Sequence, residues 1–292
     1  MTILVTGSTG HTGRETVRLL AARGARVRAL TRSPARAAFP EGVAAMPGEL
    51  ADIDSMRAAL AGVSTLFLLA PNTGDELHLT LTALNLARDA GVRGIVYLSV
   101  YQCDAHPDVP HFACKVVAER MIRRLDLPAT VLRPAFFMQN DLRQKQALDH
   151  GLYGSPVGHR GMAYVDTRDI AELAASELLR REASAVPLPL ACHDVVGPDN
   201  LTAESITATW SAALGRTIAY GGDDLDAFEA QMARHVPAGF AYDLRLMFRG
   251  FQEHGSPASV ADVAALADLL GHAPRSYADF VRDTVRGWES GS

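Results

Sequence analysis

The sequence has little cysteine and no apolar stretch of membrane-spanning length. Its three cysteines, Cys103, Cys114 and Cys192, match neither a disulfide framework nor the spacing of a zinc site. No run approaches the roughly 18 consecutive apolar residues that a membrane-spanning helix needs. The first apolar run is short and follows no basic segment, so we expect no secretory signal. These absences favour a protein of the reducing cytoplasm that holds no metal.

An excess of basic residues is also lacking. The formal net charge is −5 at pH 7, which gives no overall electrostatic basis for binding nucleic acid or an acidic membrane surface. Hydrophobic residues make up 48% of the 292 residues, enough to bury a substantial core. This length fits one large α/β domain, or a domain with a smaller lobe.

The opening of the chain carries the most informative motif. A short β-branched run, ILVT, leads into GSTGHTG, in which Gly7, Gly10 and Gly13 are spaced three apart, and an amphipathic helical pattern follows. Glycine lets the backbone turn sharply and approach a ligand closely. The free N–H groups of the following helix, at the positive end of its dipole, favour a pyrophosphate. This context predicts a dinucleotide-binding loop.

The second predicted strand, residues 26–31, ends without a carboxylate. In an NAD-binding pattern an acidic residue closes this strand and accepts hydrogen bonds from the ribose 2′-hydroxyl. Here the strand runs into Thr31, Arg32 and Ser33. A guanidinium and two hydroxyls suit a 2′-phosphate, so the sequence favours NADP over NAD.

Strands and helices then alternate. We predict strands over residues 43–47, 64–70 and 94–100, and helices over 54–60 and 76–90. This alternation is typical of a doubly wound parallel sheet of the Rossmann type. The loop at residues 71–74 follows a strand that reads as buried on both faces, and ligands bind at that edge of open α/β sheets.

Beyond the fifth strand lie several groups that could do chemistry. Tyr101 begins a polar loop, and His111 and Lys115 lie four apart at the start of a predicted helix, hence on one face. A sixth strand, 129–134, leads into an aromatic and polar segment. Its candidates for a substrate pocket are Phe136, Phe137, Gln139 and Asn140.

The last 140 residues change character. We predict a Rossmann domain over residues 1–150 and a smaller, mainly helical substrate lobe over 151–292, with some elements returning to the sheet. A helix start is expected within residues 165–171, with Asp166 or Thr167 as its cap, and a short strand is expected over 187–192. Helices follow to the end of the chain, with breaks at Gly215, Pro237, Gly255 and Pro274.

Taken together, these segments resemble a known family. GSTGHTG, TRSP, HFACKVVAERMI, LRPAFFMQN, GPDNLTAESITATWSAALGR and SYADFVRD are similar to the NmrA-like group of atypical short-chain dehydrogenases/reductases. The resemblance covers nearly the whole chain. It is nearest in pattern to the branch of triphenylmethane reductase and type-two quinone oxidoreductase.

The resemblance implies a Rossmann domain that binds NADP(H), and it implies a set of site residues. It assigns the 2′-phosphate contact to Arg32 and the nicotinamide ribose to Lys115. The implied cofactor-binding residues are Gly7, Thr9, Gly10, His11, Thr12, Gly13, Arg32, Pro71, Asn72, Ser99 and Lys115.

One position departs from ordinary short-chain dehydrogenases, which carry Tyr-x-x-x-Lys. Here His111 stands where that tyrosine would be. Hydride transfer itself is supplied by the cofactor. The proton would then come from His111, Tyr101, Lys115 or water, and histidine has the most suitable ordinary pKa, near 6.5.

The sequence therefore predicts an NADPH-dependent reductase of a small apolar substrate, aromatic or quinone-like. The alternatives are a non-catalytic NADP(H)-binding sensor and an isomerase or epimerase that keeps its cofactor. A nucleotide-sugar epimerase would be expected to carry the tyrosine that this chain lacks. We expect a small-molecule substrate, no nucleic-acid or membrane partner, and consider a homodimer as the assembly.

Overall fold

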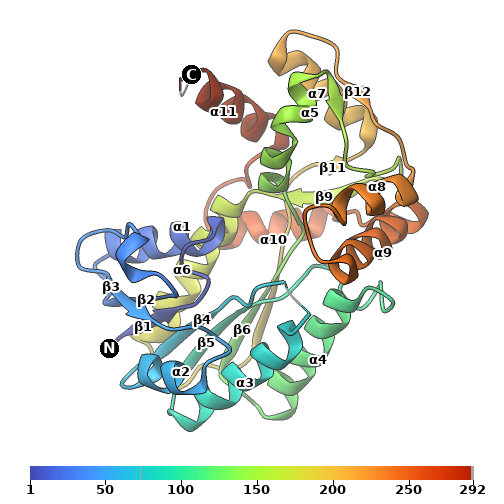
Figure 1. Cartoon of the computed structure of the whole chain (residues 1–292). Helices are drawn as coiled ribbons and strands as arrows, with labels where there is room; N and C mark the ends of the chain where they lie inside the picture. Colours follow the sequence, from blue (N-terminus) through green and yellow to red (C-terminus); the bar gives the residue numbers. More distant parts are fainter. Residues whose placement is uncertain (73, 291–292) are drawn as a thin grey trace. The chain divides into compact units, whose positions relative to one another are not determined.

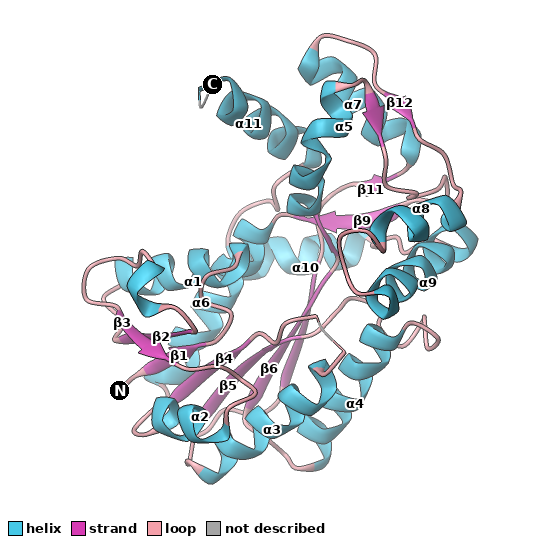
Figure 2. Cartoon of the chain, viewed as in Figure 1, coloured by secondary structure: helices cyan, strands magenta, loops and turns pink. Residues whose placement is uncertain are grey.

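Seven strands form one sheet in the order β10-β6-β5-β4-β1-β2-β3 in the computed structural model, which describes residues 1–72 and 74–290 (Figures 1 and 2). Neighbouring strands from β3 to β6 pair in parallel. The strands are β1 (Ile3–Val5), β2 (Val27–Thr31), β3 (Ala44–Pro47), β4 (Thr65–Leu68), β5 (Gly94–Leu98), β6 (Ala129–Pro134) and β10 (Ala191–Val195). The chain order reverses at β1, between β2 and β4, and such switch points hold ligands at the carboxyl ends of the strands.

Helices cover both faces of this sheet. They are α1 (His11–Ala22), α2 (Ile53–Leu60), α3 (Glu76–Asp89), α4 (Pro110–Arg124) and α6 (Thr167–Ala183), with a short 3₁₀ helix η1 (Pro34–Arg36). Apolar residues of α2, α3 and α4 pack with the sheet in one core cluster, while α1 and α6 lie on the opposite face (Figure 1). Every residue of β1, β4 and β5 is buried, as expected for parallel strands covered on both sides. The predicted Rossmann-type doubly wound sheet is confirmed.

By its internal contacts the described chain divides into two units. The first, here called the sheet unit, comprises residues 1–103, 111–133 and 168–194. The second unit comprises residues 104–110, 134–167 and 195 to the end of the described chain. The chain therefore passes between the units several times, and the predicted division into domains at residue 150 stays a prediction.

Short strands and several helices make up the second unit. A three-stranded sheet joins β7 (Phe136–Phe137), β9 (Met162–Val165) and β11 (Asn200–Leu201), and a two-stranded one joins β8 (Leu152–Tyr153) and β12 (Ala219–Tyr220). The helices are η2 (Met138–Gln144), α5 (Lys145–Asp149), α7 (Ala203–Leu214), α8 (Leu225–Met232), α9 (Ala238–His254), α10 (Val260–Leu270) and α11 (Tyr277–Ser290). The helix breaks predicted at Gly215, Pro237, Gly255 and Pro274 are confirmed.

The strand predicted over residues 187–192 is wrong in its position. Strand β10 begins only at Ala191, because Pro187 and Pro189 have no N–H to donate to a neighbouring strand. The carbonyls of Leu188 and Pro189 instead accept hydrogen bonds from the guanidinium of Arg181 in α6. Residues 187–190, which were predicted as part of a strand, thus form a loop that is hydrogen-bonded to α6.

A buried carboxyl organises part of the second unit. Asp141 accepts hydrogen bonds from the hydroxyls of Tyr153, at 2.9 Å, and Tyr277, and Trp210 Nε1 donates to the Tyr277 hydroxyl at 2.8 Å. Burial raises the pKa of Asp141 to about 7, against the opposing effect of the two tyrosine hydrogen bonds. This network joins four segments, η2, β8, α7 and α11, through one ionisable group.

No helix in the described part of the chain combines the length and the apolar character that a membrane span requires.

Candidate functional site

The glycine-rich loop after β1 has the geometry of a phosphate-binding turn. Gly7 adopts φ +58°, a left-handed conformation that other residues rarely take. A Cβ on Gly13 would lie 2.2 Å from the Gly7 carbonyl oxygen, so only glycine lets the first turn of α1 sit this close to the loop. Around Gly10 the nearest atom to an added Cβ is 3.5 Å away, and the residue is exposed. The three glycines therefore serve a turn, a close packing contact and an open face for a ligand.

The N-terminus of α1 is suited to an anion. Its N-cap is Gly10, no described side chain caps it, and its first turn holds no acidic residue. Thr9 and His11 are exposed beside Gly10, whereas Thr12 is buried. The uncapped N–H groups and the helix dipole thus face an accessible loop, the arrangement that binds pyrophosphate.

Arg32 lies directly after β2, the strand next to β1. Its side chain is exposed and makes no ion pair with any other residue that the structure describes. The preceding Thr31 accepts a hydrogen bond from the Ser33 backbone N–H at 3.2 Å. A cation at this strand end, with no carboxylate beside it, fits a 2′-phosphate.

Pro71 and Asn72 follow β4 and are exposed; Thr73, the next residue of the predicted loop, lies outside the described residues. The start of the loop is fixed to β1. Thr6 Oγ1 accepts from the Leu69 N–H at 2.8 Å and donates toward the Phe67 and Leu69 carbonyls. The chain thus leaves β4 at the switch point, next to the glycine loop.

Lys115 is buried in an ion pair that sequence reasoning missed. Its Nζ lies 2.5 Å from Glu76 Oε1, and the two side chains are only 9% and 3% exposed. The same Nζ donates to the Leu98 carbonyl at 3.1 Å. Glu76 is the first residue of α3, and a carboxylate there reads simply as a favourable helix start. Nothing in the spacing of residues 76 and 115 signals that they meet.

Ser99 belongs to a second buried carboxylate site. Its hydroxyl donates to Glu119 Oε1 at 2.7 Å, and Arg133 binds Glu119 with two nitrogens, at 2.9 and 2.5 Å. Burial raises the pKa of Glu119, but the hydrogen bonds from Arg133 and Ser99 outweigh it and hold that pKa below its ordinary value. The Ser99 hydroxyl hydrogen is therefore engaged within the protein.

The remaining candidates of this edge are His111 and Tyr101. Both are buried, with 8% and 6% of their surface exposed. His111 lies in the first turn of α4, one helical turn before Lys115, and its ring makes a T-shaped contact with that of Phe112 at a centroid distance of 4.6 Å. The predicted common face of His111 and Lys115 is thus an inward one.

The predicted substrate residues all lie in the second unit and are half-buried. Phe136 packs its ring against Tyr164 and Phe248, with centroid distances of 5.0 and 5.9 Å. Gln139 has a structural role: its Nε2 donates to Asp166 at 2.8 Å and its Oε1 accepts from the Thr167 N–H at 2.9 Å. Its amide therefore caps α6.

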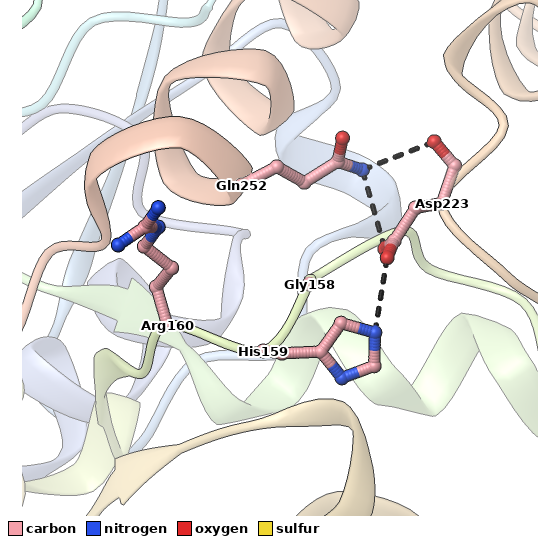
Figure 3. Close-up of a pocket in the computed structure, with 5 residues that line it drawn as sticks. All are labelled: Gly158, His159, Arg160, Asp223 and Gln252. Atoms are coloured by element: carbon pink, nitrogen blue, oxygen red, sulfur yellow. Dashed lines mark hydrogen bonds and ion pairs between the residues drawn. The ribbon is translucent and has the colours of Figure 1, made fainter.

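A cavity of about 500 Å³ opens elsewhere in the second unit (Figure 3). Its lining residues are Gly158, His159, Arg160, Asp223 and Gln252. His159 and Gln252 both bind Asp223, at 3.1 and 3.4 Å, which joins three separate segments. None of the predicted substrate residues lines this cavity.

The sheet edge can therefore hold a phosphorylated dinucleotide. The loop and the α1 N-terminus suit the pyrophosphate, Arg32 suits a 2′-phosphate, and Lys115 with Glu76 suits a hydroxylated ribose. The nicotinamide would supply the hydride when the cofactor is bound.

Comparisons with known proteins agree with this geometry. The chain is 31% identical over 290 residues to an NAD(P)H azoreductase of Xenophilus azovorans, covering 97% of this chain and 91% of the relative. It is 32% identical over 287 residues to a (4-alkanoyl-5-oxo-2,5-dihydrofuran-3-yl)methyl phosphate reductase of Streptomyces griseus, covering 95% and 96%.

A solved structure has the same fold. The NADPH complex of an NADPH-dependent quinone oxidoreductase of Escherichia coli superposes with a TM-score of 0.83, at 24% identity, covering 96% of this chain and 99% of that one. The model of the NmrA-like family matches residues 1–272. The chain belongs to the NmrA-like family.

Proposed function

We propose that this NAD(P)H-dependent oxidoreductase reduces a small apolar acceptor, aromatic or quinone-like, by hydride transfer from NADPH. The observation that carries the proposal is the carboxyl edge of the sheet. An open glycine loop follows β1, Arg32 follows β2 and has no ion pair with a described residue, and the buried Lys115 meets the end of β5. Each suits a different part of NADPH, from pyrophosphate to ribose.

Two relatives support a conjugated acceptor. The azoreductase acts, by its name, on an azo group, and the Streptomyces griseus enzyme acts on an unsaturated furanone. Both are electron-poor π systems. The half-buried Phe136 and Phe137 of the second unit offer aromatic surface for a substrate of that kind.

Reduction also needs a proton, and His111, Tyr101 and Lys115 are the groups proposed to supply it. Lys115 already donates to Glu76 and Leu98, so its ammonium is engaged within the protein. His111, in the first turn of α4, is the stronger of the other two because it lies on the same helix face as Lys115, one turn before it.

NADPH consumption tests the proposal. The purified protein is mixed with NADPH and a panel of quinones, enones, imines and azo compounds, and absorbance of the reduced nicotinamide is followed. We expect turnover with at least one conjugated acceptor and little with saturated ketones. Tight NADPH binding without turnover on any member of the panel would contradict a reductase.

That second outcome defines the alternative, a non-catalytic NADP(H)-dependent sensor. The observation that favours it is His111, which stands where ordinary short-chain dehydrogenases carry their catalytic tyrosine. A sensor would bind NADP⁺ or NADPH with different affinity and capture a partner in only one of these states. An isomerase that keeps its cofactor would instead convert substrate without net NADPH loss.

A further inference from the structure

The ion pair at the sheet edge leaves one carboxylate oxygen unexplained. Glu76 Oε1 binds Lys115, but Glu76 Oε2 is buried and has no hydrogen-bond partner among the described residues. Buried carboxylate oxygens nearly always have a donor, because removing a charged oxygen from water without one is costly. The position of Glu76 Oε2 therefore points to a donor that the described residues do not supply.

Lys115 complements this oxygen. Its ammonium carries three N–H bonds, of which one is directed at Glu76 and one at the Leu98 carbonyl. The third has no acceptor among the described residues, so the pair offers one acceptor and one donor side by side. A hydroxyl group needs both: an acceptor for its hydrogen and a donor to its oxygen.

The place of the pair in the fold identifies the hydroxyl. Leu98 is the last residue of β5, and Glu76 opens α3 just after the loop that follows β4. Both elements therefore end or begin at the carboxyl edge of neighbouring strands, which is where the cofactor lies in sheets of this type. NADP(H) presents ribose hydroxyls there.

We propose that Glu76 is a further ligand of the cofactor: its Oε2 accepts a hydrogen bond from a hydroxyl of the nicotinamide ribose while Lys115 donates to the same diol. The ion pair then has two roles. It fixes the ammonium through Oε1, and it supplies the acceptor that a lone lysine cannot.

Binding measurements test this inference without requiring turnover, so they stand apart from the proposed reductase activity. The probes are NADPH and 2′,5′-ADP, which carries the adenine half and the 2′-phosphate but no nicotinamide ribose. Affinities are measured by calorimetry for the wild type, Glu76→Gln and Glu76→Asp. The control is Asp75→Asn, which removes one charge from the exposed neighbouring residue that makes no capping contact.

We expect Glu76→Gln to weaken NADPH by about 10- to 100-fold, the worth of a charged hydrogen bond, and to change 2′,5′-ADP by less than about two-fold. Asp75→Asn should leave both affinities near wild type. Glu76→Asp keeps a negative charge beside Lys115, so this variant should fold even if Glu76→Gln does not. Its carboxylate is withdrawn by one methylene, so it should bind NADPH more weakly than the wild type.

A different result overturns the proposal. Equal losses for both probes in the Glu76 variants would mean that Glu76 only supports the fold of the site. Unchanged NADPH affinity in Glu76→Asp or Glu76→Gln would mean that Oε2 does not meet the cofactor.

Discussion

At the scale of single residues, Arg32 is the side chain that we propose to contact the 2′-phosphate of NADPH. It stands at the end of β2 where an NAD-binding chain would carry a carboxylate, and it has no ion-pair partner among the described residues. Arg32→Ala should weaken NADPH binding by about 1.5–3 kcal/mol, because a charged hydrogen bond to the 2′-phosphate is lost. NADH binding should hardly change. Fluorescence titration with both cofactors measures this, and equal losses would contradict a 2′-phosphate contact.

The Lys115–Glu76 ion pair contributes to the stability of the fold as well as to the candidate site. Both side chains are buried, so Lys115→Met leaves Glu76 without compensation and should lower the free energy of unfolding by about 3–5 kcal/mol. The double variant Glu76→Gln with Lys115→Met removes both charges and should recover much of that loss. Urea unfolding of the two single variants and the double variant gives the coupling.

The same three variants distinguish the effect of the ion pair on stability from its effect on NADPH binding. The double variant should bind NADPH poorly although it is stable, since neither the donor nor the acceptor remains. Additive losses of stability would contradict a direct interaction between the two charges.

At the carboxyl edge of the sheet, the sequence allows prediction of candidate residues that belong to one continuous motif. It does not reveal residues that are distant in the chain and close only in the folded protein. The spacing of Gly7, Gly10 and Gly13, between a predicted strand and a predicted helix, predicts the glycine loop. Glu76 does not, because a carboxylate at a helix start has an ordinary local explanation. Gln139 was predicted to line a pocket from its place after β6, yet its amide binds Asp166 and Thr167, residues whose proximity no local pattern reveals.

At the scale of elements, the close contact between the glycine loop and α1 predicts different losses of stability for alanine substitutions at two glycines. Gly13→Ala should cost about 1–3 kcal/mol of stability, because its Cβ would lie 2.2 Å from the Gly7 carbonyl and the helix must move. Gly10→Ala should cost less than about 1 kcal/mol, since its Cβ meets nothing closer than 3.5 Å.

Cofactor affinity distinguishes the two variants further. Gly10→Ala should bind NADPH much more weakly despite its near-normal stability, because the new methyl group covers the face where a pyrophosphate must approach. Thermal melting and NADPH titration of both variants check this. Normal NADPH affinity in Gly10→Ala would argue against that face as the phosphate site.

Most elements were predictable because each has a strong local signal. The apolar runs of β4 and β5 and the glycine or proline breaks between the later helices fix those elements to within a few residues. Strand β10 was misplaced because Leu188 and Leu190 look like strand residues, while the prolines between and before them forbid pairing. The guanidinium of Arg181 donates hydrogen bonds to carbonyls of this loop, a tertiary contact that cannot be predicted from the local sequence.

At the scale of the whole molecule, Asp141 makes stability depend on pH. Its pKa rises from 3.8 to about 7 on folding, so the folded protein holds this proton more tightly than the unfolded chain. The stabilisation is fully present below about pH 4 and is lost as pH rises toward 7. The difference between these two pKa values corresponds to roughly 4 kcal/mol in the free energy of unfolding.

Asp141→Asn provides the comparison. Between pH 4.5 and 7.5 the wild type should lose stability relative to the Asn variant, because the variant has no proton to release. Urea unfolding at several pH values checks this. Parallel curves for the two proteins would show that Asp141 does not titrate in this range.

The path of the chain has a consequence for how such a protein can change. Residues 104–110, 134–167 and 195 onward belong to one unit, and the stretches between them belong to the other. No single cut separates the two, and neither can be transplanted as one continuous cassette. A chimera that exchanges the second unit for that of a relative must carry three segments together, while α6 stays in the sheet unit with its partners Ser64, Thr65 and Thr130. New specificity in this architecture is therefore more accessible by substitution within those segments than by recombination of whole blocks.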